Sequence, residues 1–239
     1  MRTTKKISVF LLTAAMLTLL PAGPACAQYT ETGLVPVYNF TPKAYKALEQ
    51  NWCATEDNRG LIYVGNNAGI LEYDGVHWTL IPPSDGSPVH SIARNDSGRI
   101  FFGSVNTFGY LETDSIGNLQ YHLLSDLLPE EERDFHEVWE THVTGKKVFF
   151  QSFHRIFTWD HDSLRVFHSD QEIQESFLVE GELFLSFPEA GISCFRNDTL
   201  QPVVQSVLPD KALVYGMVPE GAGQILIVTE KHGFYRLKF

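Results

Sequence analysis

The stretch "GNNAG" at residues 65–69 is the first segment of this chain whose residue types could do chemistry. Glycine-rich loops hold phosphate when a Gly-Lys-Ser/Thr ending and a following helix supply the hydrogen-bond donors. This stretch has neither, and it recurs in altered form as "GSVNTFG" and "SFPEAG" further along the chain. It is better interpreted as a turn that the chain uses several times.

Carboxylates and histidines give no catalytic or metal signature either. The densest acidic group is Glu130-Glu131-Glu132 with Asp134. Glycoside hydrolysis needs two acids roughly 5 to 10 Å apart, but a solvated loop explains this group more simply. The 9 histidines show neither i, i+4 spacing nor a neighbouring cysteine ligand. We therefore expect no catalytic residue, no metal site and no cofactor.

The first 27 residues have the features of a secretory signal peptide. Arg2, Lys5 and Lys6 precede the apolar run Ile7 to Leu20, and Ala25-Cys26-Ala27 supplies small residues before a cut at Ala27/Gln28. The apolar run is too short to span a bilayer, which takes roughly 20 helical residues. We expect a cleaved signal and a periplasmic mature chain without membrane insertion. A lipoprotein cut before Cys26 is the minor alternative.

The charge of the chain excludes several classes of partner. Cleavage of the signal would change the net charge from −11 to −14. Nucleic acid and anionic lipid both require clustered Lys and Arg, so neither is an expected direct partner. Neutral or cationic ligands are favoured. Two cysteines would remain, Cys53 and Cys194, and their wide spacing suggests two free, buried thiols.

The rest of the chain is a repeat of about 40 residues. Five segments align on a glycine in a polar turn, and these anchor glycines are separated by 38, 47, 36 and 40 residues. They are Gly60, Gly98, Gly145, Gly181 and Gly221. Repeats of this length are typical of solenoids and propellers.

Each repeat contains the pattern of four short strands. The second strands are strongly apolar, and the third strands usually begin at a glycine and end in an Asp or Asn hairpin turn. The second strands are expected at Leu61–Val64, Ile100–Phe102, Val148–Phe150, Leu183–Leu185 and Ile225–Val228. Four strands per 40 residues predict an all-β fold, a β-propeller of about five four-stranded blades. The expected blades are residues 51–88, 89–136, 137–172, 173–212 and 213–239.

The two ends of the repeat leave two readings open. An N-terminal segment, residues 28–50, contains a short helical pattern at Ala44 to Gln50 and a strand pattern at Leu34 to Phe40. The fifth repeat stops where a third strand finishes. Leu34 to Phe40 could supply the missing fourth strand and close a five-bladed ring. Alternatively, the chain is the first part of a longer propeller, which we favour.

The segment "YNFTPKAYKALEQNWCATEDNRGLIYVGNNAGILEYDGVHW" resembles the start of the exported sensor region of two-component regulator propeller proteins. Repeats of that family are similar to "D-x-x-G-x-I-x-x-G-T-x-x-G-L-x-x-Y-D". The resemblance covers residues 34–239 and weakens in the last three units, where Arg155 replaces a turn glycine. In the family, a triple-tyrosine domain, a membrane span and a cytoplasmic kinase or DNA-binding output follow the propeller.

The resemblance implies a sensor fragment without its output domain. It also implies an oligosaccharide ligand, because many members of the family sense products of glycan breakdown, and a homodimer or contacts with downstream sensor domains. Two other readings remain. One is a secreted glycosidase or lyase that uses Glu137 with Glu189, and the other is a protein-interaction scaffold.

Propeller geometry narrows the choice of ligand-binding residues. The starts of the first strands and the turns between second and third strands converge at one mouth of the channel. Counting eight residues back from each anchor glycine places Trp52, His90, Glu137, Ile173 and Leu213 at the strand starts. Amides, imidazoles and aromatic faces suit the hydroxyls and the apolar face of a sugar. The predicted ligand-binding residues are Trp52, Asn66, Asn67, His90, Asn106, Phe108, Glu137 and His154. For each residue the alternative is a packing or turn-forming role.

Overall fold

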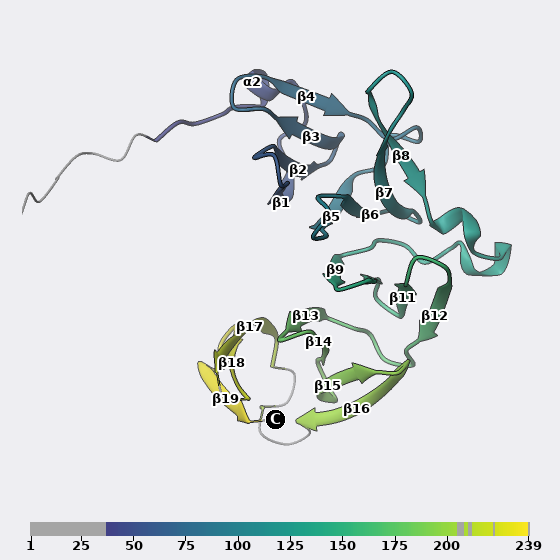
Figure 1. Ribbon diagram of the computed structural model, residues 1–239. Helices are drawn as coiled ribbons and strands as arrows, with labels where there is room; N and C mark the ends of the chain where they lie inside the picture. Colours follow the sequence, from purple (N-terminus) through teal and green to yellow (C-terminus); the bar gives the residue numbers. More distant parts are fainter. Residues whose placement is uncertain (1–36, 205–207, 210–211, 222, 239) are drawn as a thin grey trace, which may run out of the picture. The chain divides into compact units, whose positions relative to one another are not determined.

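The computed structural model describes residues 37–204, 208–209, 212–221 and 223–238 (Figure 1). The predicted signal peptide and its cleavage site lie outside these residues. The chain divides into two units, residues 1–39 and residues 40–239. All the helices and strands in the described part of the chain belong to the second unit.

Five antiparallel sheets follow one another along the second unit, so the predicted all-β propeller fold is confirmed (Figure 1). The first sheet contains β1 (Asn51–Glu56), β2 (Ile62–Asn66), β3 (Gly69–Tyr73) and β4 (Trp78–Ile81). The second contains β5 (Val89–Arg94), β6 (Ile100–Ser104), β7 (Phe108–Thr113) and β8 (Leu119–Leu123). The third contains β9 (Glu140–Thr144), β10 (Lys147–Gln151), β11 (Arg155–Trp159) and β12 (Leu164–His168). The fourth contains β13 (Glu175–Val179), β14 (Glu182–Phe187), β15 (Gly191–Arg196) and β16 (Thr199–Val204). The fifth contains β17 (Val214–Gly221), β18 (Gln224–Thr229) and β19 (Phe234–Lys238).

The anchor glycines lie in or beside the first hairpin turn of each blade, as predicted. All five have positive φ angles between 57° and 87°, a backbone conformation that favours glycine. The hairpins differ in length. Five residues separate the last paired residues in the first two blades, Glu56 with Ile62 and Arg94 with Ile100. Only two residues separate them in the third, fourth and fifth blades.

Each pair of neighbouring blades shares one apolar core. The four cores lie between the first and second, second and third, third and fourth, and fourth and fifth blades. β6 shows how the strand alternation serves this packing. Phe102 belongs to the core with the first blade and Phe101 to the core with the third, and both are buried. The first strands of consecutive blades also lie against each other, as the inner strands of a propeller do.

The longest spacing between anchor glycines is explained by an ordered insertion between the second and third blades. It carries two short 3₁₀ helices, η1 (Ser125–Leu127) and η2 (Glu130–Glu132). Leu124, Leu128 and Phe135 pack into the core between these blades. Glu130 and Glu131 are exposed, as expected for a solvated loop, but Glu132 forms an ion pair with Arg155 and a hydrogen bond with His168.

The N-terminal predictions need correction. The helix is α2 (Pro42–Tyr45), earlier and shorter than predicted, because Pro42 begins it and Lys46, with a φ of 55°, ends it. Of the strand predicted at Leu34 to Phe40, residues 34–36 lie outside the described residues and Val37–Phe40 are not in a strand. Phe40 instead packs its ring against Tyr73 and Trp78 on the outer strands of the first blade.

Within the described residues, no helix has the length and hydropathy needed to cross a membrane. Both cysteines of the blades are free thiols, with Cys194 buried and Cys53 half-buried.

Gly109 in β7 should tolerate no side chain. A Cβ atom there would lie 1.9 Å from the carbonyl oxygen of His122 on β8, so β7 and β8 would have to move apart. Gly109→Ala should therefore lower the free energy of unfolding by about 3 kcal/mol or more. Gly117→Ala is the control, because its Cβ would meet nothing within 4 Å, and its positive φ should cost only about 1 kcal/mol. Urea denaturation compares the two, and equal losses would contradict the close approach of the strands.

Candidate functional site

The inner strands of three blades carry the same irregularity at their starts. In β1 the pairing with β2 slips by one residue between Asn51 and Cys53, so that Trp52 is the extra residue of a β-bulge. The same slip makes His90 the extra residue in β5 and Tyr215 the extra residue in β17. A bulge turns its extra side chain out of the normal alternation. All three of these side chains are aromatic rings.

Trp139 and Gln174 occupy the matching position in the third and fourth blades. Each directly precedes the first residue paired with the second strand, Glu140 and Glu175 respectively. Trp139 also donates its backbone N–H to the carbonyl of Gln151, and Gln174 donates to that of Ser186, both at 2.9 Å. Gln151 and Ser186 are the residues paired with Glu140 and Glu175. The inner start of every blade is therefore marked by one residue, namely Trp52, His90, Trp139, Gln174 and Tyr215.

The predicted first-strand entries coincide with these residues in the first two blades and differ from them in the other three. A constant offset of eight residues works for Trp52 and His90 because their blades have five-residue hairpins. The two-residue hairpins bring the matching residue closer to the anchor glycine, so the count gave Glu137, Ile173 and Leu213 instead. Ile173 is fully buried in the core between the third and fourth blades.

Four rings from three consecutive blades form a continuous aromatic cluster, which we define as Trp52, His90, Trp139 and Phe153. Trp52 meets His90 edge to face, with ring centroids 4.8 Å apart, and His90 stacks on Trp139 at 4.7 Å. Trp139 meets Phe153 edge to face at 5.7 Å. Trp52 is 41% exposed, whereas His90 is only 8% exposed. The cluster thus presents one accessible indole beside the buried ring of His90 and the half-buried rings of Trp139 and Phe153.

Polar atoms of the aromatic cluster are arranged for hydrogen bonding. The indole N–H of Trp52 donates to Oδ1 of Asn67 at 2.7 Å, which fixes both side chains. His90 Nδ1 and Trp139 Nε1 are buried and lack a hydrogen-bond partner among the described residues. Buried polar atoms without partners are unfavourable by roughly 1–3 kcal/mol each.

The environment of the cluster is acidic, and its ionisation is shifted by burial. Burial lowers the pKa of His90, although Glu137 opposes this, so the imidazole is neutral at pH 7. Burial, reinforced by Glu175, raises the pKa of Glu140 to about 7. Burial also raises the pKa of Cys53 to about 11, which keeps this thiol protonated and unreactive. No group of three or more His, Cys, Asp or Glu side chains in the described part of the chain could hold a metal ion.

Two of the predicted ligand-binding residues have packing roles instead. Asn66 is fully buried, and its Nδ2 donates to the carbonyls of Leu48 and Gln50 and to Oδ1 of Asn51. Its Oδ1 accepts the N–H of Ala68, so no polar atom is left for a ligand. Phe108 is fully buried in the core between the second and third blades. Burial leaves neither side chain accessible to a ligand in this structure.

The remaining predicted residues differ in how they relate to the cluster. Asn106 accepts the backbone N–H groups of Phe135 and His136, so its amide oxygen anchors the insertion rather than facing a ligand. Glu137 is half-buried and acts electrostatically on His90. His154 is exposed, and its neighbour Phe153 is the residue of this turn that belongs to the cluster. Glu189 is exposed, and no contact in this part of the chain joins it to Glu137.

Comparison with known proteins supports the fold. No protein-family model matches the sequence, and no curated protein does. Among solved structures, similar ones include the extracellular domain assigned to the one-component system BT4673 from B. thetaiotaomicron, with a TM-score of 0.58 and 14% identity. It matches 79% of this chain and 26% of its own length.

Two further similar structures are a second extracellular domain and an enzyme. The extracellular domain assigned to the hybrid two-component system BT3049 from B. thetaiotaomicron has a TM-score of 0.55 at 14% identity, over 79% of this chain and 28% of its own. Virginiamycin B lyase from Staphylococcus aureus, solved with quinupristin, has a TM-score of 0.60 at 14% identity, over 87% of this chain and 75% of its own. The chain thus spans about a quarter of the length of the two extracellular domains. The resemblance predicted from the repeat motif is confirmed at the level of the fold.

The raised pKa of Glu140 predicts a stability that falls as the pH rises. A carboxyl whose folded-state pKa lies above its ordinary value stabilises the fold fully below that ordinary value and loses this stabilisation as the pH rises through about 7. Because Glu140 is only half-buried, we expect a contribution on the order of 1–2 kcal/mol. In Glu140→Gln the decline in unfolding free energy between pH 4.5 and 7.5 should be shallower than in the wild type. Urea denaturation at several pH values measures it, and parallel curves for the two proteins would contradict the assignment.

Proposed function

We propose that this chain is the ligand-binding part of an exported sensor, and that it binds a neutral oligosaccharide at the aromatic cluster. The observation that carries the proposal is the meeting of Trp52, His90 and Trp139 at matching positions of three consecutive blades. The contacts among these rings join different blades. The rings form a surface only where the inner strands meet.

The chemistry of the cluster suits a sugar ring. The exposed indole of Trp52 offers a flat apolar face for the C–H side of a pyranose. The Nδ2 amide of Asn67, beside that indole, can donate to a hydroxyl, while its Oδ1 is held by Trp52. His90 Nδ1 and Trp139 Nε1 provide further hydrogen-bonding capacity. Glu137, which acts electrostatically on His90, makes the surroundings acidic, which favours a neutral ligand over a uronate.

Export and signalling are supported by independent features. The basic, apolar and small-residue segments of residues 1–27 are those of a secretory signal. Similar folds occur in extracellular domains of bacterial sensor systems. In such an arrangement, ligand binding at the inner strands would be transmitted through the blades to whatever domain follows. The partners would be an oligosaccharide and the adjoining sensor domains or a second copy of the chain.

Catalysis by a propeller lyase or glycosidase is the alternative function. The similarity to virginiamycin B lyase concerns the fold alone at 14% identity. No structural feature favours Glu137 and Glu189 as a catalytic pair.

Removing the exposed indole should weaken glycan binding. Trp52→Ala should reduce the affinity for the best oligosaccharide of a neutral panel about tenfold or more, since tenfold corresponds to roughly 1.4 kcal/mol. Trp139→Phe, which keeps a ring but removes the unpaired N–H, should reduce it less. Trp78→Phe is the matched control, because Trp78 stacks on Tyr73 in the outer part of the first blade. Isothermal titration calorimetry and tryptophan fluorescence measure the three variants.

Three results would sink the proposal. One is the absence of binding by any neutral glycan to a folded wild-type protein. Another is an unchanged affinity in Trp52→Ala, which would place the site elsewhere. The third is cleavage of the glycan, detected by chromatography of the mixture, which would make the protein an enzyme.

A further inference from the structure

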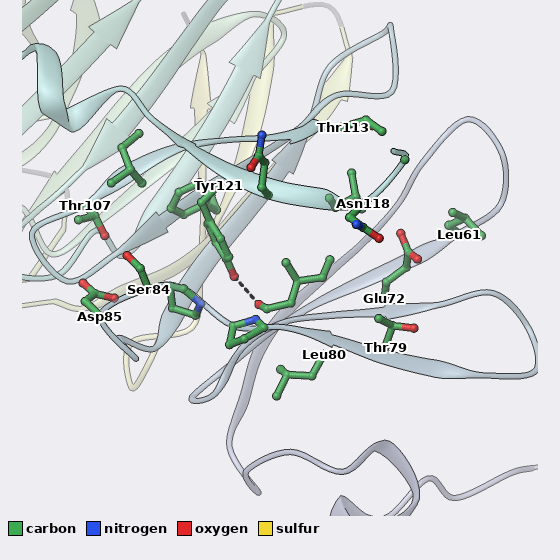
Figure 2. A pocket seen from close by; sticks show the side chains of 18 of the residues that line it. Leu61, Glu72, Thr79, Leu80, Ser84, Asp85, Thr107, Thr113, Asn118 and Tyr121 are labelled. Atoms are coloured by element: carbon green, nitrogen blue, oxygen red, sulfur yellow. Dashed lines mark hydrogen bonds between the residues drawn. The ribbon is translucent and has the colours of Figure 1, made fainter. Parts of the chain in front are cut away.

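A cavity of about 720 Å³ lies between the outer strands of the first and second blades (Figure 2). Residues of β3 and β4 form one wall and residues of β8 form the other, with the connection from Pro82 to Asp85 at one end. None of the four residues of the aromatic cluster lines it. Its volume lies within the range of small-molecule sites, roughly 300–1,000 Å³. It is therefore a second place at which a ligand could bind.

The cavity exists because one cross-strand pair is polar and leaves the space between the blades unfilled. Glu72 on β3 faces Thr79 on β4, two residues beyond the buried pair Ile70 and Ile81. The matching pair on the second blade is Tyr110 and His122. Their rings stack at 4.5 Å, and Tyr110 reaches Trp159 of the third blade, with ring centroids 5.9 Å apart.

The wall from the first blade holds a carboxylate in a fixed position. The hydroxyl of Tyr63 donates to Oε2 of Glu72 at 2.7 Å, and Nη2 of Arg59 donates to that hydroxyl at 3.0 Å. Nε of Arg59 donates to Asp57 at 2.8 Å. The other carboxylate oxygen of Glu72, Oε1, has no hydrogen-bond partner among the described residues. This row of side chains is organised before any ligand arrives.

Arg59 does not leave its charge free for an anion. Its guanidinium forms an ion pair with Asp57 at 2.7 Å, and the Asp57 side chain is only 2% exposed. Burial opposes the ionisation of Asp57, but hydrogen bonds from Arg59 and Leu61 outweigh it and lower the pKa of Asp57. Glu72 and, at the other end, Asp85 remain, and no lysine lines the cavity. The charge balance therefore favours a cation.

The wall from the second blade combines an apolar stripe on β8 with the polar residues Thr107, Thr113, Asn118 and Gln120. Leu119, Tyr121 and Leu123 alternate along β8 and pack toward the first blade. The hydroxyl of Tyr121 donates to the carbonyl of Ile81 at 2.7 Å, the bond drawn in Figure 2, and accepts the N–H of Ile70 at 3.1 Å. These two bonds hold the ring as a rigid part of the wall.

From these two walls we infer a second ligand site, for an organic amine with an apolar body. Its ammonium group would donate to Oε1 of Glu72, and its hydrocarbon or aromatic part would lie along Leu119, Tyr121 and Leu123. The site is separate from the proposed glycan site.

Three probes with the same phenyl body and different head groups test this inference. They are 2-phenylethylamine, 2-phenylethanol and phenylacetate, added to the whole chain and followed by NMR chemical-shift changes. We expect binding in the order amine, alcohol, carboxylate, with the amine at least about fivefold tighter than the alcohol. Glu72→Gln should weaken the amine about tenfold and leave the alcohol unchanged, because glutamine still accepts the Tyr63 hydroxyl. Glu131→Gln, at an exposed position of the insertion, is the matched control.

A second variant is designed to fill the cavity with side chains that the neighbouring blade already accommodates. The double substitution Glu72→Tyr with Thr79→His copies the pair of the second blade and should abolish binding of all three probes. Equal binding of amine and alcohol by the wild type, or unchanged amine binding in Glu72→Gln, would overturn the inference. Trp52→Phe should leave the amine affinity unchanged. Because Trp52 belongs to the proposed glycan site and not to the cavity, amine binding tests the cavity independently of the glycan proposal.

Discussion

The second, third and fourth blades of this protein each have two apolar faces that they cannot cover alone. β6 shows this most directly, because the neighbouring residues Phe101 and Phe102 point to opposite faces and are both buried, one against the third blade and one against the first. A sheet of four short strands with such a pattern needs a neighbouring blade against each of its apolar faces. The order of the blades and the contacts between their inner strands follow from this requirement.

The candidate site arises from the same constraint rather than from a motif. Since the inner strands lie against each other, the residues that begin them come together. The β-bulges then decide which side chain points to the common surface, and they select Trp52 in β1 and His90 in β5. A group assembled in this way has no signature in any one segment. It can be recognised only when the repeats are placed side by side.

The fold could be predicted from the sequence and the site only in part, for physical reasons. Anchor glycines and apolar second strands are local features, so the repeat and its strands were found. Trp139 was missed because its distance from the anchor glycine depends on the length of the hairpin that contains the glycine. A fixed count of eight residues ignores that length. Asn66 looked like a ligand-facing amide, yet the carbonyls of Leu48 and Gln50 need donors, and the buried amide supplies them. That demand comes from the path of the segment before β1, which the repeat pattern does not describe.

Positions where one repeat departs from its neighbours are the most informative about function. Close packing requires side chains to fill the space between blades. Tyr110 and His122 do so between the second and third blades. Glu72 and Thr79 hold the same position one blade earlier, where a cavity of about 720 Å³ remains. His90 and Trp139 add two buried nitrogens without hydrogen-bond partners among the described residues, an arrangement that is uncommon in folded proteins. Both features leave a polar group beside rings or hydrocarbon side chains, which is the combination that small-molecule sites use.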